Sequence, residues 1–304
     1  MKILILVIAL IAAVALPISG QSCSEAAKEV APDLTAAAKL KYSENLEIAA
    51  RNAVTQPTAD NIIWYARRKG YLGKYKDAVD AITIALKQFP NDARMYRHRG
   101  HRYITLRCFD DAIKDFEKAA KLVNGKPDEV EPDGMPNARN IPTSTLQSNI
   151  WYHLGLAYYL KGDFKKALAA YKECMKVSKN SDMLAATSHW YYMVLRRLEK
   201  NKDAERVLEP FNGDFEVIEN ADYLKLLRFY RGEVKADALM SEMGEKAETL
   251  GNASLGYGLG NWYLYNGDRD KAMDIFRKIV GGNQWASFGY IAAEAELVRK
   301  SAVK

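Results

Sequence analysis

The sequence of 304 residues is poor in cysteine and lacks the short motifs that mark many enzymes. Three cysteines cannot make the disulfide framework of a small secreted domain. No nucleophile elbow, zinc-binding helix or phosphate loop occurs in its required context, so we predict a protein that is not an enzyme and has no cofactor. The 44 basic and 38 acidic residues are dispersed along the chain, which argues against nucleic-acid binding.

The apolar run at residues 3–16 is too short to span a bilayer. A charged start precedes this run, and small residues follow it at Gly20 and Ser22, which is the form of a secretory signal peptide at 1–22. We therefore expect export to a periplasm or to the exterior. After removal of the signal, we expect no transmembrane span.

Cys23 offers an alternative, because bacterial lipoproteins are cut before a cysteine that then carries the lipid. Gln21 and Gly20 match the expected lipoprotein signal poorly, so a lipid anchor in the outer membrane is the less favoured prediction. The other two thiols, Cys108 and Cys174, are expected at a turn between helices and at a helix-packing position.

The stretch 149–171 has the pattern of two helices joined by a tight turn. Its packing positions recur at steps of three and four residues on both sides of a Gly-Asp interruption at 162–163. These positions are Trp151, Leu154, Gly155, Tyr158, Ala167 and Tyr171. Gly155 and Ala167 should let the two helices approach closely, so a large side chain at Gly155 should separate them.

The same positions recur at a fixed period along the chain. Ala78 and Ala112 are 34 residues apart, and Ala112 and Ala167 are 55 apart, which is 34 + 21. One insertion of 21 residues explains the longer step. A later series, Ala204, Ala238 and Ala272, again advances by 34. We therefore predict six helical hairpins, of which the fourth and fifth are degenerate.

This pattern resembles the tetratricopeptide repeat, W-x2-L-G-x2-Y followed by A-x3-F. The resemblance implies an all-α fold, a right-handed solenoid of about six hairpins with capping helices at both ends. Over roughly 60–299 the chain looks like uncharacterised exported bacterial proteins of this family, which share segments similar to 128–134 and 284–290. The family commonly holds peptides or partner segments on the concave wall that the first helices form.

We divide the chain into a signal peptide (1–22), a lead-in with a capping helix (23–58), repeats one and two (59–126), an insertion (127–147), repeat three (148–181), degenerate repeats four and five (182–252), repeat six (253–286), and a closing helix with a tail (287–304). Four prolines and two glycines at 124–145 exclude a regular helix or strand there. Long loops of this kind are often functional.

The family layout places ten residues on the predicted concave wall. They are Trp64, Arg67, Tyr71, Arg94, Arg97, His98, His101, Tyr152, His153 and His189. All four histidines of the protein are in this set, so the wall should be cationic and aromatic and should favour an acidic or aromatic peptide segment. Replacing Arg97, His98 and His101 together should abolish partner capture and leave the melting temperature nearly unchanged.

The favoured function is a non-catalytic scaffold or adaptor of the bacterial cell envelope. A second possibility for the wall is structural: its arginines and histidines could solvate a helix face or pair with acidic residues of the insertion. The alternative function is an exported protein or enzyme that binds a metal or small ligand in the wall and the insertion. His98, His101 and His153 could in principle form such a metal site, although we predict none.

Overall fold

The structure is a computed structural model that describes residues 22–244 and 251–301. These residues form fifteen α-helices, and the described part of the chain contains no strand beyond an isolated bridge between Val130 and Thr145. The predicted all-α fold is confirmed. The predicted signal peptide lies almost wholly outside the described residues.

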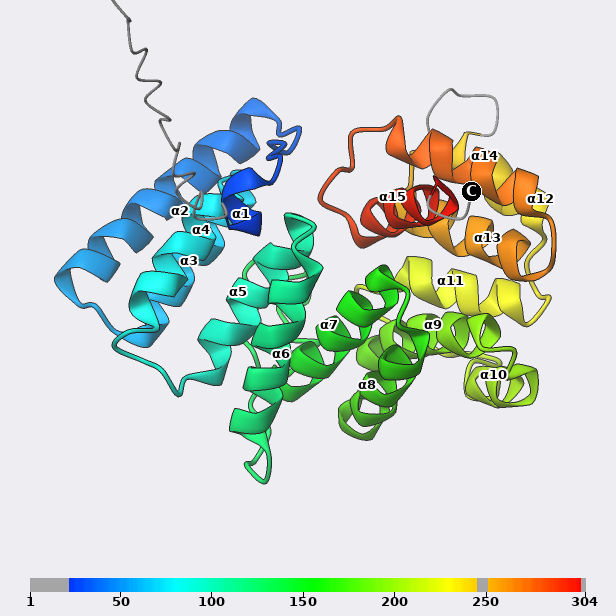
Figure 1. Ribbon diagram of the computed structural model, residues 1–304, viewed down its shortest axis with the longest axis horizontal. Coiled ribbons are helices and arrows are strands. Elements are labelled where there is room, and N and C mark those ends of the chain that lie inside the picture. Colours follow the sequence, from blue (N-terminus) through cyan, green and yellow to red (C-terminus); the bar gives the residue numbers. More distant parts are fainter. Residues whose placement is uncertain (1–21, 245–250, 302–304) are drawn as a thin grey trace, which may run out of the picture.

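Twelve of the helices follow one another along an arc as six consecutive pairs, of which five pack closely, whereas the two helices of the fifth pair make few contacts with each other (Figure 1). In chain order the hairpins are α3 (Ala59–Tyr71) with α4 (Tyr75–Ala85), α5 (Ala93–Thr105) with α6 (Phe109–Val123), α7 (Leu146–Lys161) with α8 (Phe164–Val177), α9 (Ser181–Arg197) with α10 (Asn201–Leu208), α11 (Ala221–Tyr230) with α12 (Ala236–Met243), and α13 (Ala253–Tyr265) with α14 (Arg269–Val280). They are flanked by α1 (Cys23–Ala26), α2 (Ala36–Thr55) and α15 (Phe288–Ser301). The predicted solenoid of six hairpins with helices at both ends is therefore confirmed.

Each hairpin turns through one residue in the left-handed region of backbone conformation. These residues are Gly73 (φ 79°), Arg107 (φ 65°), Gly162 (φ 84°), Glu199 (φ 58°), Gly232 (φ 81°) and Gly267 (φ 96°). Glycine adopts this conformation at no steric cost, whereas it costs other residues about 1–3 kcal/mol. Arg107 is held in it by side-chain contacts to the C-terminal segment, which are described below.

Close packing within the hairpins depends on a glycine that faces an aromatic ring. A Cβ atom at Gly155 would lie 2.8 Å from the ring of Tyr171, closer than real Cβ contacts come. The same arrangement occurs at Gly100 with Phe116 and at Gly260 with Phe276. The steric role that the sequence predicts for Gly155 is therefore confirmed.

The fifth hairpin departs from the predicted core. Ala238 was expected to be a core position, but it is exposed, and Leu239 is fully buried instead. In the other five hairpins a buried alanine follows the left-handed turn residue by five positions, whereas Leu239 follows Gly232 by seven. Gly232 comes 33 positions after Glu199 rather than 34, and two extra residues follow it, so the buried position of α12 moves by one residue from Ala238 to Leu239.

The arc of hairpins closes through its C-terminal segment. Arg107, at the turn between α5 and α6, donates hydrogen bonds to Glu294 of α15 (2.6 Å) and to the carbonyl oxygen of Trp285 (2.9 Å). Its guanidinium group also lies 3.9 Å from the centre of the Trp285 ring. Arg299 donates to the carbonyl oxygen of Leu160 at the end of α7 (2.7 Å). Figure 1 shows the segment before α15 extending toward α5.

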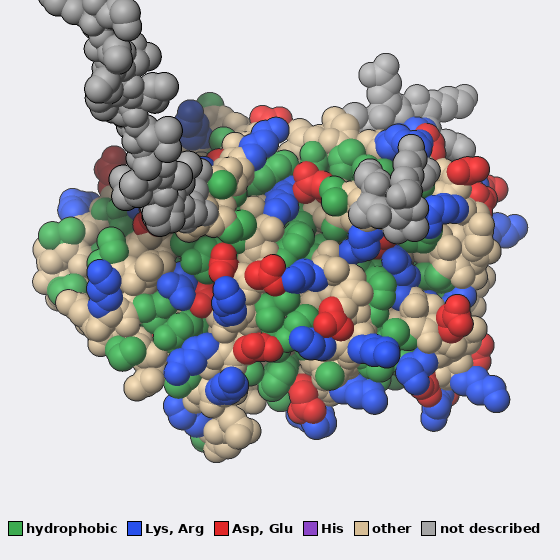
Figure 2. Space-filling view, in the orientation of Figure 1, with side chains coloured by type: hydrophobic (Ala, Val, Ile, Leu, Met, Phe, Trp, Pro, Cys, Tyr) green, Lys and Arg blue, Asp and Glu red, His purple; other side chains and the backbone are tan. Residues whose placement is uncertain are grey.

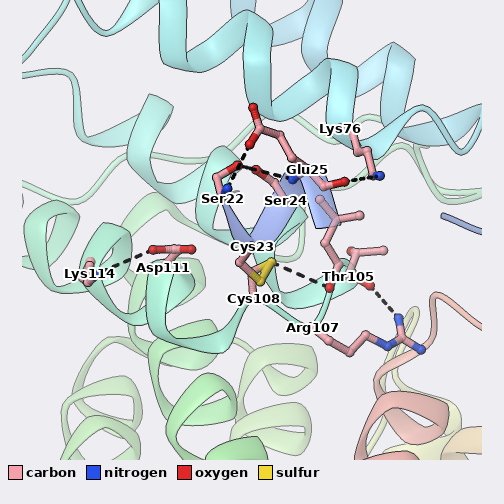
Figure 3. Close-up of a disulfide and its surroundings, with 11 residues drawn as sticks. Ser22, Cys23, Ser24, Glu25, Lys76, Thr105, Arg107, Cys108, Asp111 and Lys114 are labelled. Atoms are coloured by element: carbon pink, nitrogen blue, oxygen red, sulfur yellow. Dashed lines mark hydrogen bonds and ion pairs between the residues drawn. A yellow bond between two sulfur atoms is a disulfide. The ribbon is translucent and has the colours of Figure 1, made fainter. Parts of the chain in front are cut away.

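A disulfide between Cys23 and Cys108 links α1 to the turn between α5 and α6 (Figure 3). We did not predict this bond, which joins residues 85 positions apart. A cross-link over such a loop typically stabilises a fold by about 2–4 kcal/mol. It also engages the sulfur atom that a lipid would need, so the alternative prediction of a lipid on Cys23 is incompatible with the disulfide-bonded structure. Cys174 is a buried free thiol, as expected.

Among residues 22–244 and 251–301, no helix combines the length and the apolar composition needed to cross a bilayer. On the face shown in Figure 2, basic and acidic side chains are interspersed, which agrees with the dispersed charges of the sequence.

We predict that Gly155→Val lowers the free energy of unfolding by about 3 kcal/mol, because the added atoms must displace the buried ring of Tyr171. Ala169→Val on the exposed face of α8 is the control and should cost less than about 1 kcal/mol. Urea unfolding followed by circular dichroism measures both. Equal effects of the two substitutions would show that the close contact at Gly155 does not hold the hairpin together.

Candidate partner-binding groove

The insertion between α6 and α7 lies across the first helices of repeats one and two. Arg67 of α3 donates to the carbonyl oxygen of Pro132 (2.8 Å), and Arg68 donates to that of Gly134 (3.0 Å). The carboxylate of Glu131 lies 2.9 Å from Nε of Arg97. The insertion is therefore an ordered part of the wall rather than a separate loop.

Arg97 and His98 lie beneath the insertion. Each is 7% exposed, and Glu131 lies 3.8 Å from Nε2 of His98 in addition to its contact with Arg97. These contacts match the structural possibility raised for the wall, in which its arginines and histidines pair with acidic residues of the insertion. The expectation that Arg97 and His98 can be replaced without loss of stability is not supported, because replacement would leave Glu131 buried without a partner.

The histidines of α5 are neutral hydrogen-bond acceptors toward Arg97. Nη1 of Arg97 lies 3.1 Å from Nδ1 of His98 and 3.5 Å from Nδ1 of His101. A guanidinium group only donates, so both Nδ1 atoms accept and the ring proton is on Nε2. Burial, reinforced by the neighbouring arginines, lowers the pKa of both histidines well below the ordinary value. A metal ion bound at these Nδ1 atoms would have to displace Arg97.

The wall around repeat three is covered by the start of α15. The ring of Phe288 lies 5.5 Å from that of His101, 5.5 Å from that of His153 and 6.4 Å from that of Tyr152. Tyr152 is 6% exposed and His153 is 4% exposed. The prediction that Tyr152 and His153 face a partner is therefore wrong, because the protein's own C-terminal helix occupies that place.

His189 of α9 is also inside the protein. It is 1% exposed, and its ring stacks on Tyr223 at 4.7 Å and on Tyr230 at 5.9 Å. The hydroxyl group of Tyr230 lies 3.3 Å from its Nδ1 atom. The prediction that His189 lines a partner groove is wrong, since the next hairpin packs directly onto it.

Five of the predicted wall residues stay partly open to solvent: Trp64, Arg67, Tyr71, Arg94 and His101, of which His101 lies against the ring of Phe288. Three of them line a pocket of about 260 Å³ between α3, α5 and the insertion; Tyr71 and His101 lie outside it. Its other lining residues are Asp60, Ile63, His98, Glu129, Val130, Glu131, Pro132 and Leu146. We call this the insertion pocket. Part of its charge is already paired, because Arg94 forms ion pairs with Asp60 and Asp92.

From the sequence, we did not identify two charged residues of this region as site residues. Glu131 is one of the acidic residues of the insertion, which entered the sequence analysis only as a group. Arg102 follows His101 directly, and it points toward Gly70 of α3, where a Cβ atom would lie 2.5 Å from its Nη1 atom. Gly70 was the feature of the sequence that could have indicated Arg102, because a glycine there leaves room for its guanidinium group.

An arc of stacked helical hairpins with a pocket on its first helices defines a repeat solenoid, a class of protein that typically presents its surface to other proteins. Models of the tetratricopeptide repeat match residues 66–127, 148–181 and 254–281. The chain therefore contains tetratricopeptide repeats, as the sequence resemblance implied. Proteins of this kind typically mediate protein–protein interactions and are generally non-catalytic.

Curated relatives match parts of the chain at low identity. Small glutamine-rich tetratricopeptide repeat-containing protein 2 of Saccharomyces cerevisiae is 23% identical over 58% of this chain and 45% of its own length. The BBSome complex member BBS4 of Bos taurus is 28% identical over 52% of this chain and 26% of its own length. The chain thus spans less than half the length of these relatives.

Similar solved structures include YrrB, described as a TPR protein with an unusual peptide-binding site. It is 17% identical, with a TM-score of 0.43, and the match covers 83% of this chain and 99% of YrrB. A tetratricopeptide repeat protein from Parabacteroides merdae is 15% identical, with a TM-score of 0.49 and coverage of 84% and 93%.

We predict that the protein loses stability in mild acid because of its buried histidines. Burial lowers the pKa of His153 and that of His189 to about 3. The unfolded chain, with histidine pKa values of about 6.5, therefore binds more protons than the folded chain between these values. The free energy of unfolding should fall below pH 6.5, by up to about 1.4 kcal/mol per pH unit for each histidine.

Urea unfolding at pH 7.5, 6 and 5 measures this dependence. His189→Phe keeps an aromatic ring between Tyr223 and Tyr230 and should reduce the slope by about one proton. A slope that stays the same in this variant would contradict the neutral, buried state of His189.

Proposed function

We propose that the protein is an exported, non-catalytic interaction scaffold of the bacterial cell envelope and that the insertion pocket holds part of its partner. The supporting observation is that this pocket of about 260 Å³ contains three of the predicted wall residues that stay accessible. Toward repeats three and four, Tyr152, His153 and His189 are buried by the protein itself. The partner therefore meets the wall at repeats one and two.

The lining of the insertion pocket indicates the chemistry of the partner. Trp64, Ile63 and Leu146 supply apolar surface, and Val130 of the insertion is 64% exposed beside them. The guanidinium group of Arg67 lies 4.3 Å from the centre of the Trp64 ring. Aromatic and arginine side chains dominate the energetics of many interfaces. We infer a peptide segment that places an apolar or aromatic side chain against Trp64 and a carboxylate near Arg67.

Export is the second part of the proposal. The apolar run at 3–16 has the pattern of a signal peptide, although it lies outside the described residues. The Cys23–Cys108 disulfide is of a kind that persists in oxidising compartments such as a periplasm. Both observations support a chain that works outside the cytoplasm, without a lipid on Cys23.

Partner capture by variants of the pocket tests the proposal. We expect Trp64→Ala to reduce the affinity for the partner by about tenfold or more, as loss of an aromatic anchor does. The melting temperature should change little, because Trp64 is only partly buried. The partner is first identified by cross-linking in the native envelope, and its affinity for the purified variants is then measured.

Ile84→Ala is the matched control, because it also removes a large apolar side chain, one that is 66% exposed on α4. This variant should keep the native affinity. Unchanged affinity of Trp64→Ala, or an equal loss in Ile84→Ala, would exclude the insertion pocket as the binding site.

A further inference from the structure

A second cavity lies between α3, α4 and α5. Its volume is about 100 Å³, and its lining residues are Ala66, Arg67, Tyr71, Ile82, Arg97, His98, His101 and Arg102. We call it the arginine cavity. It would hold about three water molecules, so a small group can fit and a peptide segment cannot.

The charge of the arginine cavity is not balanced by the protein. Three guanidinium groups line it, and no acidic side chain does. Glu131 forms an ion pair with Arg97 from the direction of the insertion. Within the described residues, neither Arg67 nor Arg102 has a carboxylate partner. At least two positive charges therefore face the cavity without a matching anion.

Arg102 is the least satisfied of the three arginines. In the part of the chain that the structure describes, its side chain has no hydrogen bond or ion pair, and its guanidinium group lies 5.8 Å from the centre of the Tyr75 ring. Burial lowers the pKa of Arg102 to about 10, which still leaves it charged at neutral pH. A partly buried cation without a partner raises the free energy of the folded protein. Binding of an anion beside that cation would lower this free energy.

The other polar groups of the lining are suited to donate hydrogen bonds. His98 and His101 accept from Arg97 at Nδ1 and so carry their proton on Nε2. Tyr71 has a hydroxyl group. A ligand of this cavity must therefore supply the negative charge and most of the acceptor atoms.

We propose that the arginine cavity binds a phosphate group. Its guanidinium groups come from two helices, α3 and α5, so they can reach several oxygen atoms of a tetrahedral anion rather than one edge of a planar carboxylate. A phosphate dianion also matches the two unpaired positive charges. Arg67 and His98 line both the arginine cavity and the insertion pocket, but this inference does not rest on the partner-binding proposal, because it is tested without a partner.

Isothermal titration calorimetry of the disulfide-intact chain tests the proposal. Inorganic phosphate and glycerol phosphate are titrated separately at pH 8 and constant ionic strength, and sodium acetate is the planar comparison. Binding of inorganic phosphate identifies the free anion as a ligand, and binding of glycerol phosphate alone identifies a phosphate ester. Either result supports the site, and acetate should bind at least tenfold more weakly.

Arg102→Met should weaken phosphate binding by about tenfold or more, because it removes a charged donor. Arg102→Lys should restore part of the affinity, which separates loss of charge from loss of fold. Arg206→Met on the exposed face of α10 removes the same charge far from the cavity and should bind phosphate like the native chain. The proposal is overturned if neither phosphate compound binds at millimolar concentration, if acetate binds as tightly as phosphate, or if Arg102→Met and Arg206→Met have equal effects.

Discussion

The packing of α15 against the first helices of repeats two and three is the contact on which the rest of this structure depends. A solenoid of helical hairpins has an open inner wall unless something fills it. Here Phe288 lies against His101, Tyr152 and His153, and Arg107 holds the preceding segment through Trp285 and Glu294. The C-terminal helix thus turns part of a binding wall into a core.

The wall is also covered at repeats one and two, where the insertion packs on the first helices. Glu131 neutralises Arg97, and the carbonyl groups of Pro132 and Gly134 accept from Arg67 and Arg68. Buried guanidinium groups need such partners, because an unpaired buried charge is strongly destabilising. Within the described residues, Glu131 is the one carboxylate of the insertion that forms an ion pair with these arginines, whereas three arginines line the cavity beneath it. The two ends of the wall therefore differ: one is a closed aromatic core, and the other keeps the arginine cavity.

The fold could be predicted because it follows from local rules that repeat. Gly155, Gly100 and Gly260 each face an aromatic ring of their own hairpin, and the repeated spacing from each glycine to the later alanine and aromatic residue of its hairpin indicates this contact without coordinates. The failure at Ala238 has the same origin, since a changed spacing around one turn shifts the buried position by one residue.

The site could be predicted only in part, because accessibility depends on contacts between distant segments. His153 and His189 carry the same sequence signal as an exposed wall residue, namely a polar ring on a first helix. What buries His153 is Phe288, which lies 135 positions later in the chain. Trp64 and Arg67 stay partly accessible because the insertion, which reaches Arg67 through Pro132, leaves a pocket beside them. A period identifies the face of a helix, but it does not identify what packs on that face.

The closure of the wall by α15 is tested most directly by native-state hydrogen exchange. If α15 is packed as part of the core, the amide groups of Phe288–Ser301, apart from the last turn, should be protected to a degree similar to those of α7. Amides of α15 that exchange as rapidly as those of a frayed end, while those of α7 remain protected, would show that the helix does not close the wall and that His101, Tyr152 and His153 are open to a partner after all.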